Sequence, residues 1–199
     1  GLPEGWGIRT LSDLMDFSPR EKLPKGTLAP YLDMKALPTA GMSAEPPYDR
    51  AFTSGTKFRA RDTLLARITP CLENGKTAMV DDLGAAEIGW GSTEFIVMRA
   101  KGSTPSSLPY CVARDVSFRE EAIASMTGSS GRQRADAKTI AAIETAVPPQ
   151  EIIVAFGQAT MPMIDKAHQL GSENQTLATL RDTLLPRLMS GELSVGNAK

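Results

Sequence analysis

The composition of the chain changes at Val147–Pro149, and this change constrains the fold more than any other feature. Before it, Gly and Pro are frequent and apolar runs are short, whereas the sequence after it has a helical pattern. The segment Pro148–Glu151 is typical of a helix start, because proline suits the first helical position and an acid suits the first turn. The sequence therefore predicts a domain over residues 1–148 and a helical arm over residues 149–199.

Apolar residues recur every seven positions along the arm and so form one stripe. Additional leucines widen this stripe toward the end of the arm. Its members are Phe156, Met163, Leu170, Leu177, Leu180, Leu184 and Leu188. A sustained heptad favours a coiled-coil seam, but an amphipathic helical hairpin packed on the domain would give the same periodicity. Pro162 and Pro186 lie inside the pattern, and each predicts a break or a kink unless it lies near a helix end. Gly191 is a candidate C-cap.

The first 148 residues have the pattern of a mixed α+β globular domain. Short runs of β-branched and apolar residues stand between Gly, Pro and Asp, as in strands separated by turns. We expect strands at 29–34, at Phe58, and at 63–68, 76–80 and 94–99. We expect helices over Leu11–Phe17 and Pro109–Met126, and a loop at Gly128–Gly131.

Composition excludes several classes of protein. The chain has 199 residues, of which 41% are hydrophobic and 23% charged, so it can bury a core and is not a disordered chain. It has no apolar run of about 18 residues and no secretory signal pattern, so we expect a cytoplasmic protein without a membrane contact.

In a cytoplasmic protein we expect the two cysteines, Cys71 and Cys111, to be reduced thiols. With His168 as the one histidine, no metal-ligand spacing exists, and we expect no metal. The start at Gly1 suggests a processed end or an excised piece.

The net charge of −1 argues mildly against a nucleic-acid binder, but the distribution of charge matters more. Basic residues outnumber acids from Asp49 to Lys76 and again from Arg132 to Lys138. The candidates for DNA contact in the first stretch are Arg59, Arg61, Arg67 and Lys76. Such local patches can meet phosphates if a basic partner helps.

The segment Gly128–Arg134 carries the most specific chemistry. Its small residues allow a close approach to a backbone, and Ser129 and Ser130 offer hydroxyl and N–H donors to phosphate. Arg132, Gln133 and Arg134 follow, and in the major groove Arg suits guanine while Gln suits adenine. A generic polar loop remains the alternative interpretation.

A catalytic alternative rests on Glu45–Tyr48, which resembles the Asn/Asp-Pro-Pro-Tyr motif of adenine methyltransferases. In those enzymes the motif holds the flipped target base. Here Glu replaces the first residue, and the sequence has no glycine-rich strand–turn–helix for S-adenosylmethionine. We therefore interpret it as a proline-rich loop. Cys71 would need His168 of the arm beside it to act as a nucleophile, so we expect no catalytic site.

Several stretches, in the same order along the chain, resemble the specificity subunits of type I restriction–modification systems. They are Leu2–Trp6, Leu64–Lys76, Trp90–Arg99, Gly128–Arg134, Pro148–Pro149, Asn174–Leu177 and Leu180–Leu193. The resemblance covers almost the whole chain. It is specific when the stretches are taken together, although each alone is weak.

The resemblance implies a non-catalytic reader of double-stranded DNA: one target-recognition domain followed by a coiled-coil spacer arm. A whole subunit of the family has two domains and two antiparallel arms, and it reads a bipartite site. Methyltransferase subunits dock on it and supply the S-adenosylmethionine chemistry on adenine, and a motor–nuclease subunit joins for cleavage. This chain has one domain and one arm, so a full reader needs two copies, which implies a homodimer. Two alternatives remain: a catalytic methyltransferase fragment, and a structural or inhibitory subunit that docks on the methyltransferase without reading DNA.

Overall fold

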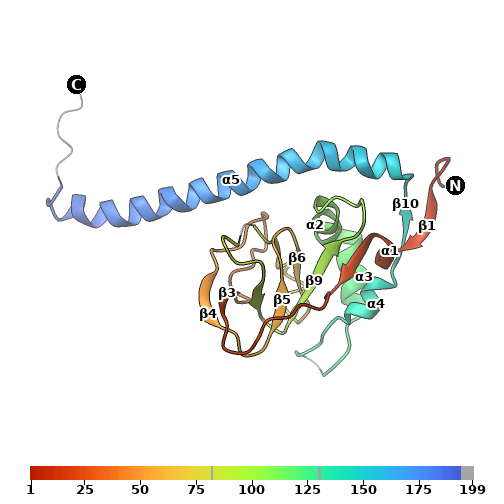
Figure 1. Ribbon diagram of the computed structural model, residues 1–199, viewed down its shortest axis with the longest axis horizontal. Helices are drawn as coiled ribbons and strands as arrows, with labels where there is room; N and C mark the ends of the chain where they lie inside the picture. Colours follow the sequence, from red (N-terminus) through yellow and green to blue (C-terminus); the bar gives the residue numbers. More distant parts are fainter. Residues whose placement is uncertain (82, 130, 194–199) are drawn as a thin grey trace.

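The computed structural model describes residues 1–81, 83–129 and 131–193. It has a mixed α/β domain of two four-stranded sheets and short helices, from which one long helix extends (Figure 1). The predicted fold class, a mixed domain followed by a long helical arm, is confirmed.

The first four-stranded sheet is antiparallel throughout and forms the centre of the domain. Its strands, in spatial order, are β2 (Met15–Phe17), β9 (Phe95–Ala100), β6 (Thr63–Ala66) and β7 (Thr77–Met79). Every residue of β6 and β7 is buried. Their apolar side chains therefore pack on both faces, which explains why these segments are continuous apolar runs rather than alternating ones.

The second sheet lies at the end of the domain farthest from the start of the long helix (Figure 1). Its order is β4 (Tyr48–Ala51), β3 (Leu28–Leu32), β8 (Gly89–Gly91) and β5 (Thr56–Phe58). The β3–β8 pair is parallel and the other two pairs are antiparallel. A Cβ on Gly89 would lie 2.5 Å from Phe58, and one on Gly91 would lie 2.4 Å from the Leu32 carbonyl oxygen. Glycine is therefore required on β8 by close packing.

Two helix predictions need correction. The expected helix over Leu11–Phe17 ends early: α1 is Leu11–Leu14, and the next three residues pair with β9 as β2. The expected helix over Pro109–Met126 is two helices, α2 (Ser107–Arg114) and α3 (Val116–Ala124). Asp115 separates them because its backbone is extended and its carboxylate accepts a hydrogen bond from the Phe118 N–H at 2.9 Å. An N-cap of this kind begins a new helix.

The main core lies between the first sheet and the helices. It combines Leu65, Ile96 and Met98 of the sheet with side chains of α1, α2, α3 and α4 (Ala137–Ala141). Ile153 from the start of the long helix belongs to the same cluster. A small antiparallel pair, β1 (Gly7–Thr10) with β10 (Glu144–Val147), joins the N-terminal segment to the base of that helix.

The arm is one helix, α5 (Gln150–Met189), of 40 residues. The predicted break at Pro162 is wrong, since the helix continues through it and bows only gently (Figure 1). Pro186 lies in the last turn, where a proline near a helix end was expected to be tolerated. The hairpin interpretation is also wrong, because one continuous helix covers the whole segment. None of the described helices has the length and apolarity that a bilayer span requires.

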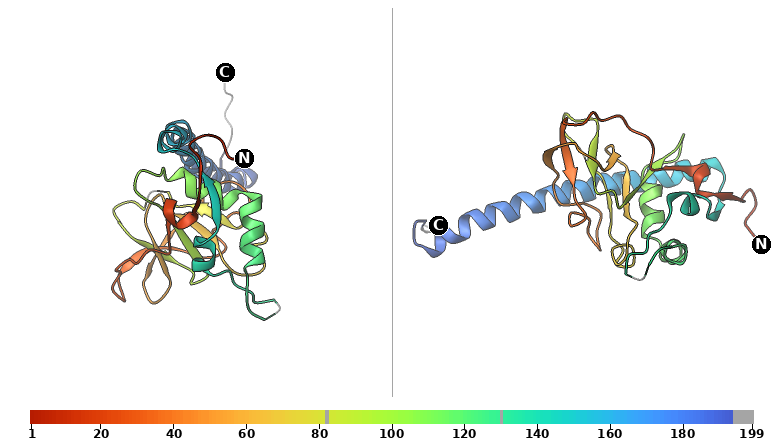
Figure 2. Two further views of the ribbon diagram at one scale, coloured as in Figure 1. Left: turned by 90° about the vertical axis from the view of Figure 1, so that its right-hand side faces the viewer. Right: turned by 90° about the horizontal axis from the view of Figure 1, so that it is seen from below.

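The first half of α5 packs along the domain. A Cβ on Gly157 would lie 2.7 Å from Cβ of Pro105, and the Ser107 and Thr160 hydroxyls are 2.7 Å apart. Ile164 is buried with Met42 and Met79. The second half extends beyond the domain (Figures 1 and 2).

Candidate nucleic-acid interface

The segment Thr127–Arg134 forms a narrow projection on the side of the domain opposite α5 (Figures 1 and 2). Reciprocal backbone hydrogen bonds close its base, from the Thr127 N–H to the Arg134 carbonyl at 3.0 Å and from the Arg134 N–H to the Thr127 carbonyl at 2.9 Å. Gly128 and Gly131 have positive φ angles, which glycine adopts without steric cost. Ser129 and Arg132 are exposed, and Ser130 lies outside the described residues. This projection can therefore present Arg132 to a large ligand.

Backbone contacts place this projection beside the end of β6. The Thr69 N–H donates to the Gln133 carbonyl at 3.1 Å, and the Ala135 N–H donates to the Arg67 carbonyl at 2.8 Å. The Arg67 N–H in turn donates to the Glu94 carbonyl at 3.0 Å. The structure thus brings together Arg67 and the Gln133 region, which are more than 60 positions apart in the sequence.

Arg134 is held by Glu94. Its Nε lies 2.9 Å from both carboxylate oxygens, and a terminal nitrogen lies 2.7 Å from Oε1. The hydrogen bond from Arg134 lowers the pKa of Glu94 below its usual value, despite partial burial. Arg134 therefore fixes the base of the projection in this structure, and Arg132 and Gln133 are the side chains beyond it.

Three other predicted contact residues also have partners inside the chain. Arg59 forms an ion pair with Glu21 at 2.6 Å, and Arg61 forms one with Asp165 of α5 at 2.8 Å. Lys76 donates to the Met34 carbonyl at 2.8 Å. For these residues a role in DNA contact stays a prediction, and each would have to share or exchange its present partner.

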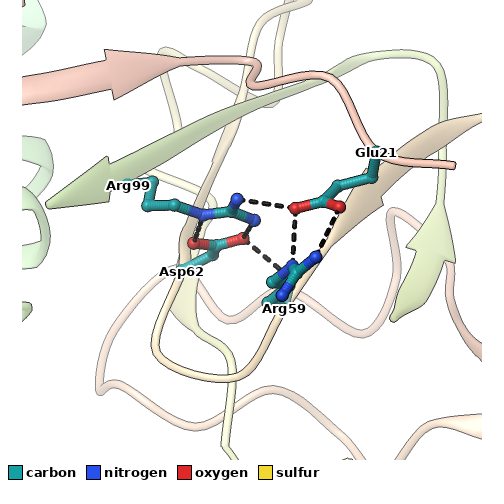
Figure 3. Close-up of polar contacts among 4 residues, drawn as sticks. All are labelled: Glu21, Arg59, Asp62 and Arg99. Carbon is teal, nitrogen blue, oxygen red and sulfur yellow. Dashed lines mark hydrogen bonds and ion pairs between the residues drawn. The ribbon is translucent and has the colours of Figure 1, made fainter. Parts of the chain in front are cut away.

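The strongest internal charge cluster joins Glu21, Arg59, Asp62 and Arg99 (Figure 3). Arg99 binds the Asp62 carboxylate through two nitrogens, both at 2.7 Å, and reaches Glu21 at 2.6 Å. Hydrogen bonds from Arg59 and then Arg99 lower the pKa of Glu21 to about 2. The cluster fastens the segment between β2 and β3 to the β5–β6 turn and to β9, and it neutralises Glu21.

A hollow of about 590 Å³ opens beside this cluster, and four basic residues contribute to its lining. Those side chains are Arg20, Lys22, Lys57 and Arg67, and Glu21 is the one carboxylate among the lining residues. Because Arg59 and Arg99 already neutralise Glu21, the hollow keeps a net positive charge. The Arg67 Nε is buried without a hydrogen-bond partner in the described part of the chain.

Sequence reasoning missed Arg20 and Lys22 because Glu21 stands between them, so the local run seems balanced. The signal that could have found them is the excess of bases over acids in Pro19–Lys25. This excess indicates a positively charged surface only once it is known that Arg59 and Arg99 neutralise Glu21.

A row of aromatic rings adjoins the hollow on the second sheet. Tyr31 lies 5.4 Å from Tyr48 and 4.4 Å from Trp90, measured between ring centroids. Arg50 stacks over Tyr31 at 4.8 Å, and Lys57 lies 5.0 Å from the centre of the Phe52 ring. Aromatic faces hold cations without neutralising them, so both charges remain available to phosphate.

The positions of Glu45 and Tyr48 give little support to the alternative of a catalytic methyltransferase fragment. Tyr48 begins the exposed strand β4 and packs edge-on against Tyr31, while Glu45 is exposed and donates its N–H to the Ala36 carbonyl. Among the described residues, no group of three or more His, Cys, Asp or Glu side chains is arranged to hold a metal ion.

This arrangement, an α/β domain with one long C-terminal helix, is similar to about half of each of two solved S subunits of type I systems. The HsdS subunit from Thermoanaerobacter tengcongensis matches with a TM-score of 0.57 at 22% identity, over 90% of this chain and 48% of that one. The S subunit of a type I system from M. genitalium also gives a TM-score of 0.57, at 16% identity, over 93% of this chain and 46% of that one.

The curated relatives of this chain are also type I specificity subunits. The specificity subunits of the type I restriction enzymes EcoEI and EcoAI, both from Escherichia coli, are each 27% identical to this chain over 97% and 92% of its length. That of HindI from Haemophilus influenzae is 33% identical over 67 residues. No family model matches the chain. The resemblance to type I specificity subunits is therefore confirmed, and the chain spans about a third of the length of EcoEI and EcoAI, 35% and 33%.

Proposed function

We propose that this chain reads DNA sequence for a type I restriction–modification complex and does no chemistry itself. Its relatives are specificity subunits. The observation that carries the proposal is the combination, on the domain away from α5, of a projecting polar loop with a cationic hollow beside its base. Sequence-specific binding needs contacts to base edges, which read the sequence, and contacts to phosphates, which position the protein. The loop can approach base edges, and the neighbouring cations can hold phosphates.

Within this surface we propose two roles. Arg132 and Gln133 of the projection read base edges, while Arg20, Lys22, Lys57 and Arg67 hold the phosphate backbone. Methyltransferase subunits supply S-adenosylmethionine chemistry on adenine, and a motor–nuclease subunit supplies cleavage. Because the domain has little net charge, the isolated chain binds DNA weakly, and the methyltransferase tightens binding.

The decisive experiment is methylome sequencing of cells that express this chain with a type I methyltransferase subunit. A methylated motif that is absent when the chain is absent supports the proposal. Methylation without any motif, or none in a complex that assembles, contradicts it. Binding of S-adenosylmethionine to the isolated chain would favour the catalytic alternative instead.

Single substitutions separate the two roles. Gln133→Ala is expected to relax the motif at one position, at a cost of about 1–3 kcal/mol for the lost base contact. Lys22→Ala and Lys57→Ala are expected to weaken binding to all sequences alike and to lower its salt dependence. Lys166→Ala, on the exposed side of α5, is the matched control and should change neither.

We also propose that α5 spaces two copies of the domain along DNA in an antiparallel pair. The two half-sites are then identical and palindromic about the gap. Seven residues inserted after Ser172 preserve the heptad and lengthen the arm by about 10 Å, since each helical residue adds about 1.5 Å. The gap should grow by about three base pairs of about 3.4 Å each, with the half-sites unchanged. A changed half-site with an unchanged gap would make the helix part of the reader.

A further inference from the structure

A cavity of about 290 Å³ lies between α5 and the β3–β4 connection (residues 33–47). Three parts of the chain contribute to its lining. They are the segment from Ser43 to Pro47, the two residues Val80 and Asp81 directly after β7, and residues of α5 between His168 and Thr176. The DNA interface proposed above does not include this cavity, so its chemistry calls for a separate explanation.

Packed elements hold the walls of the cavity in place. Ser43 forms a parallel bridge with Met79 of β7, and the Glu45 N–H donates to the Ala36 carbonyl at 2.9 Å. A Cβ on Gly171 would lie 2.8 Å from the Ser43 hydroxyl oxygen, so α5 approaches the β3–β4 connection closely. The cavity is therefore built by the fold, with one wall from the helix and one from the domain.

His168 is the residue of this cavity that indicates a ligand. Its side chain lines the cavity and is only 4% exposed. Burial lowers the pKa of His168, so the ring is neutral at pH 7 and carries one N–H donor and one acceptor. Nδ1 lies 3.0 Å from a carboxylate oxygen of Asp81, which favours the proton on Nδ1.

The other ring nitrogen, Nε2, is then a buried acceptor that lacks a donor. Neither nitrogen of His168 has a hydrogen bond of regular geometry among the described residues. Most buried polar side-chain atoms in proteins have a hydrogen-bond partner, because an unpaired one costs its full desolvation free energy. A ligand with an N–H donor would satisfy this acceptor.

The charge of the cavity indicates that this donor is a cation. Asp81 and Glu45 contribute carboxylates to the lining, and none of the described lining residues is a Lys or an Arg. The nearby Arg61 is already paired with Asp165 at 2.8 Å. The apolar part of the wall comes from Leu32, Ala44, Pro46, Pro47, Val80 and Leu83. A fitting ligand therefore combines a cationic head that carries N–H donors with an apolar stem.

We propose that this cavity binds an alkylammonium or alkylguanidinium cation. The head donates to His168 Nε2 and lies beside the carboxylates of Asp81 and Glu45, while the alkyl stem lies on the apolar wall. A metal ion fits less well, because no group of three or more His, Cys, Asp or Glu side chains among the described residues is arranged to hold one. The bound cation ties α5 to the β3–β4 connection and so fixes the arm against the domain.

NMR of the imidazole tests the proposal on the full chain, because His168 is its one histidine. Butylguanidinium is the probe, and tetramethylammonium, a cation without N–H donors, is the matched control. Butylguanidinium should move the Nε2 resonance, with a Kd on the order of 1 mM because few atoms make contact. No movement, or the same movement with tetramethylammonium, overturns the proposal.

Substitutions at two exposed positions of the wall locate the binding without disturbing the core. Glu45→Gln removes one carboxylate and should weaken butylguanidinium binding about threefold, as expected for an exposed charge pair. Ser172→Leu brings a larger side chain to the wall and should abolish binding. Glu73→Gln, an exposed acid outside the cavity, is the matched control and should have no effect. Equal affinity in all three variants would place the binding elsewhere and overturn the site.

Two sources supply this chemistry, a free polyamine and a Lys or Arg side chain of a docked protein. The affinity of the chain for a type I methyltransferase subunit, measured with and without saturating butylguanidinium, distinguishes them. If a side chain of that subunit enters the cavity, butylguanidinium and Ser172→Leu should each weaken the complex. If the ligand is a free amine, neither should change it. Both results require the NMR response of the isolated chain, and without that response the cavity binds no such cation. The methylated motif tests DNA reading separately.

Discussion

The two halves of α5 differ in what supports them. In the first half, Ile153, Gly157, Ile164 and His168 are buried against the domain. In the second half, the large apolar side chains Leu177, Leu180, Leu185, Leu188 and Met189 are exposed. Because isolated helices gain most of their stability from tertiary packing, the first half is stabilised within one chain. The second half presents an apolar surface that a partner would cover.

The side chains that α5 places against its domain also differ in size from those that it leaves exposed. Small residues make the closest contacts with the domain: in the first half Gly157 lies over Pro105 and Thr160 meets Ser107, and just beyond it Gly171 approaches Ser43. Small residues let the helix lie close to the domain at these points, while the large exposed residues Met163, Leu170 and Leu177 lie on a neighbouring face. One helix therefore has one face that contacts its own domain and another face whose large apolar side chains are exposed, which the proposed second chain would cover.

The largest expected effect is on the second half. Leu177→Asp combined with Leu184→Asp should abolish the dimer, because each carboxylate would be buried in an apolar seam. The free energy of unfolding of the domain should change by no more than about 0.5 kcal/mol, because Leu177 is exposed and both positions lie in the half of α5 that extends beyond the domain. Sedimentation velocity and thermal unfolding measure the two effects. A dimer that persists would remove the support for pairing through this stripe.

A substitution in the first half of α5 should lower the stability of the domain, which the substitutions in the second half leave almost unchanged. Ile164→Ala removes a side chain buried with Met42 and Met79, and it should lower the free energy of unfolding by about 2–5 kcal/mol. Leu177→Ala is the matched control and should leave the unfolding of the domain almost unchanged. If both variants unfold alike in urea, the two halves are not supported differently.

The close approach at Gly157 gives a smaller effect. Gly157→Ala would place a Cβ against the rigid Pro105 ring at 2.7 Å, and we expect a loss of about 1–3 kcal/mol from overpacking. Gly171→Ala meets mainly the Ser43 hydroxyl, which can rotate away. There, the gain in helix propensity of about 1 kcal/mol should offset the contact. Urea denaturation of both variants gives the comparison, and equal losses would contradict it.

Much of the fold follows from sequence patterns, and the exceptions have physical causes. The buried strands around β6 and β9 were predicted because continuous apolar runs between turn residues have few alternatives. β1, β4 and β10 were missed because they are short and Val147 is their one buried residue, so no apolar alternation marks them. The division at Asp115 was missed because a single capping residue inside an otherwise helical segment leaves little local signal.

The candidate site was predictable only in part. The projection at 127–134 has a strong signal, because glycines bracket polar residues that suit phosphates and bases. The partners of Arg59, Arg61 and Arg134 could not be predicted, since Glu21, Asp165 and Glu94 reach them only through the fold. Arg114 was also missed: it donates to the Thr39, Gly41, Gly75 and Thr77 carbonyls and so fastens α2 to β7, to the loop before β7 and to the β3–β4 connection. Long-range ion pairs of this kind leave no local pattern.

The smallest effect concerns His168, the one histidine of the chain, which is buried where α5 leaves the domain. Burial lowers its pKa below 6.5, and the nearby Arg61 adds to this, although Asp81 at 3.0 Å and Asp165 oppose it. Below pH 6.5 the unfolded chain therefore binds a proton that the folded chain resists, so stability should fall as pH decreases from 6.5. The folded-state pKa values of Glu21 and Glu94 are lowered from 4.5, so their contributions are lost only at more acidic pH. Between pH 7 and pH 5 the loss should thus come mainly from His168. Urea unfolding across this range should show the decline in the natural chain and a flat profile in His168→Leu. An equal slope in both would place the titrating group elsewhere.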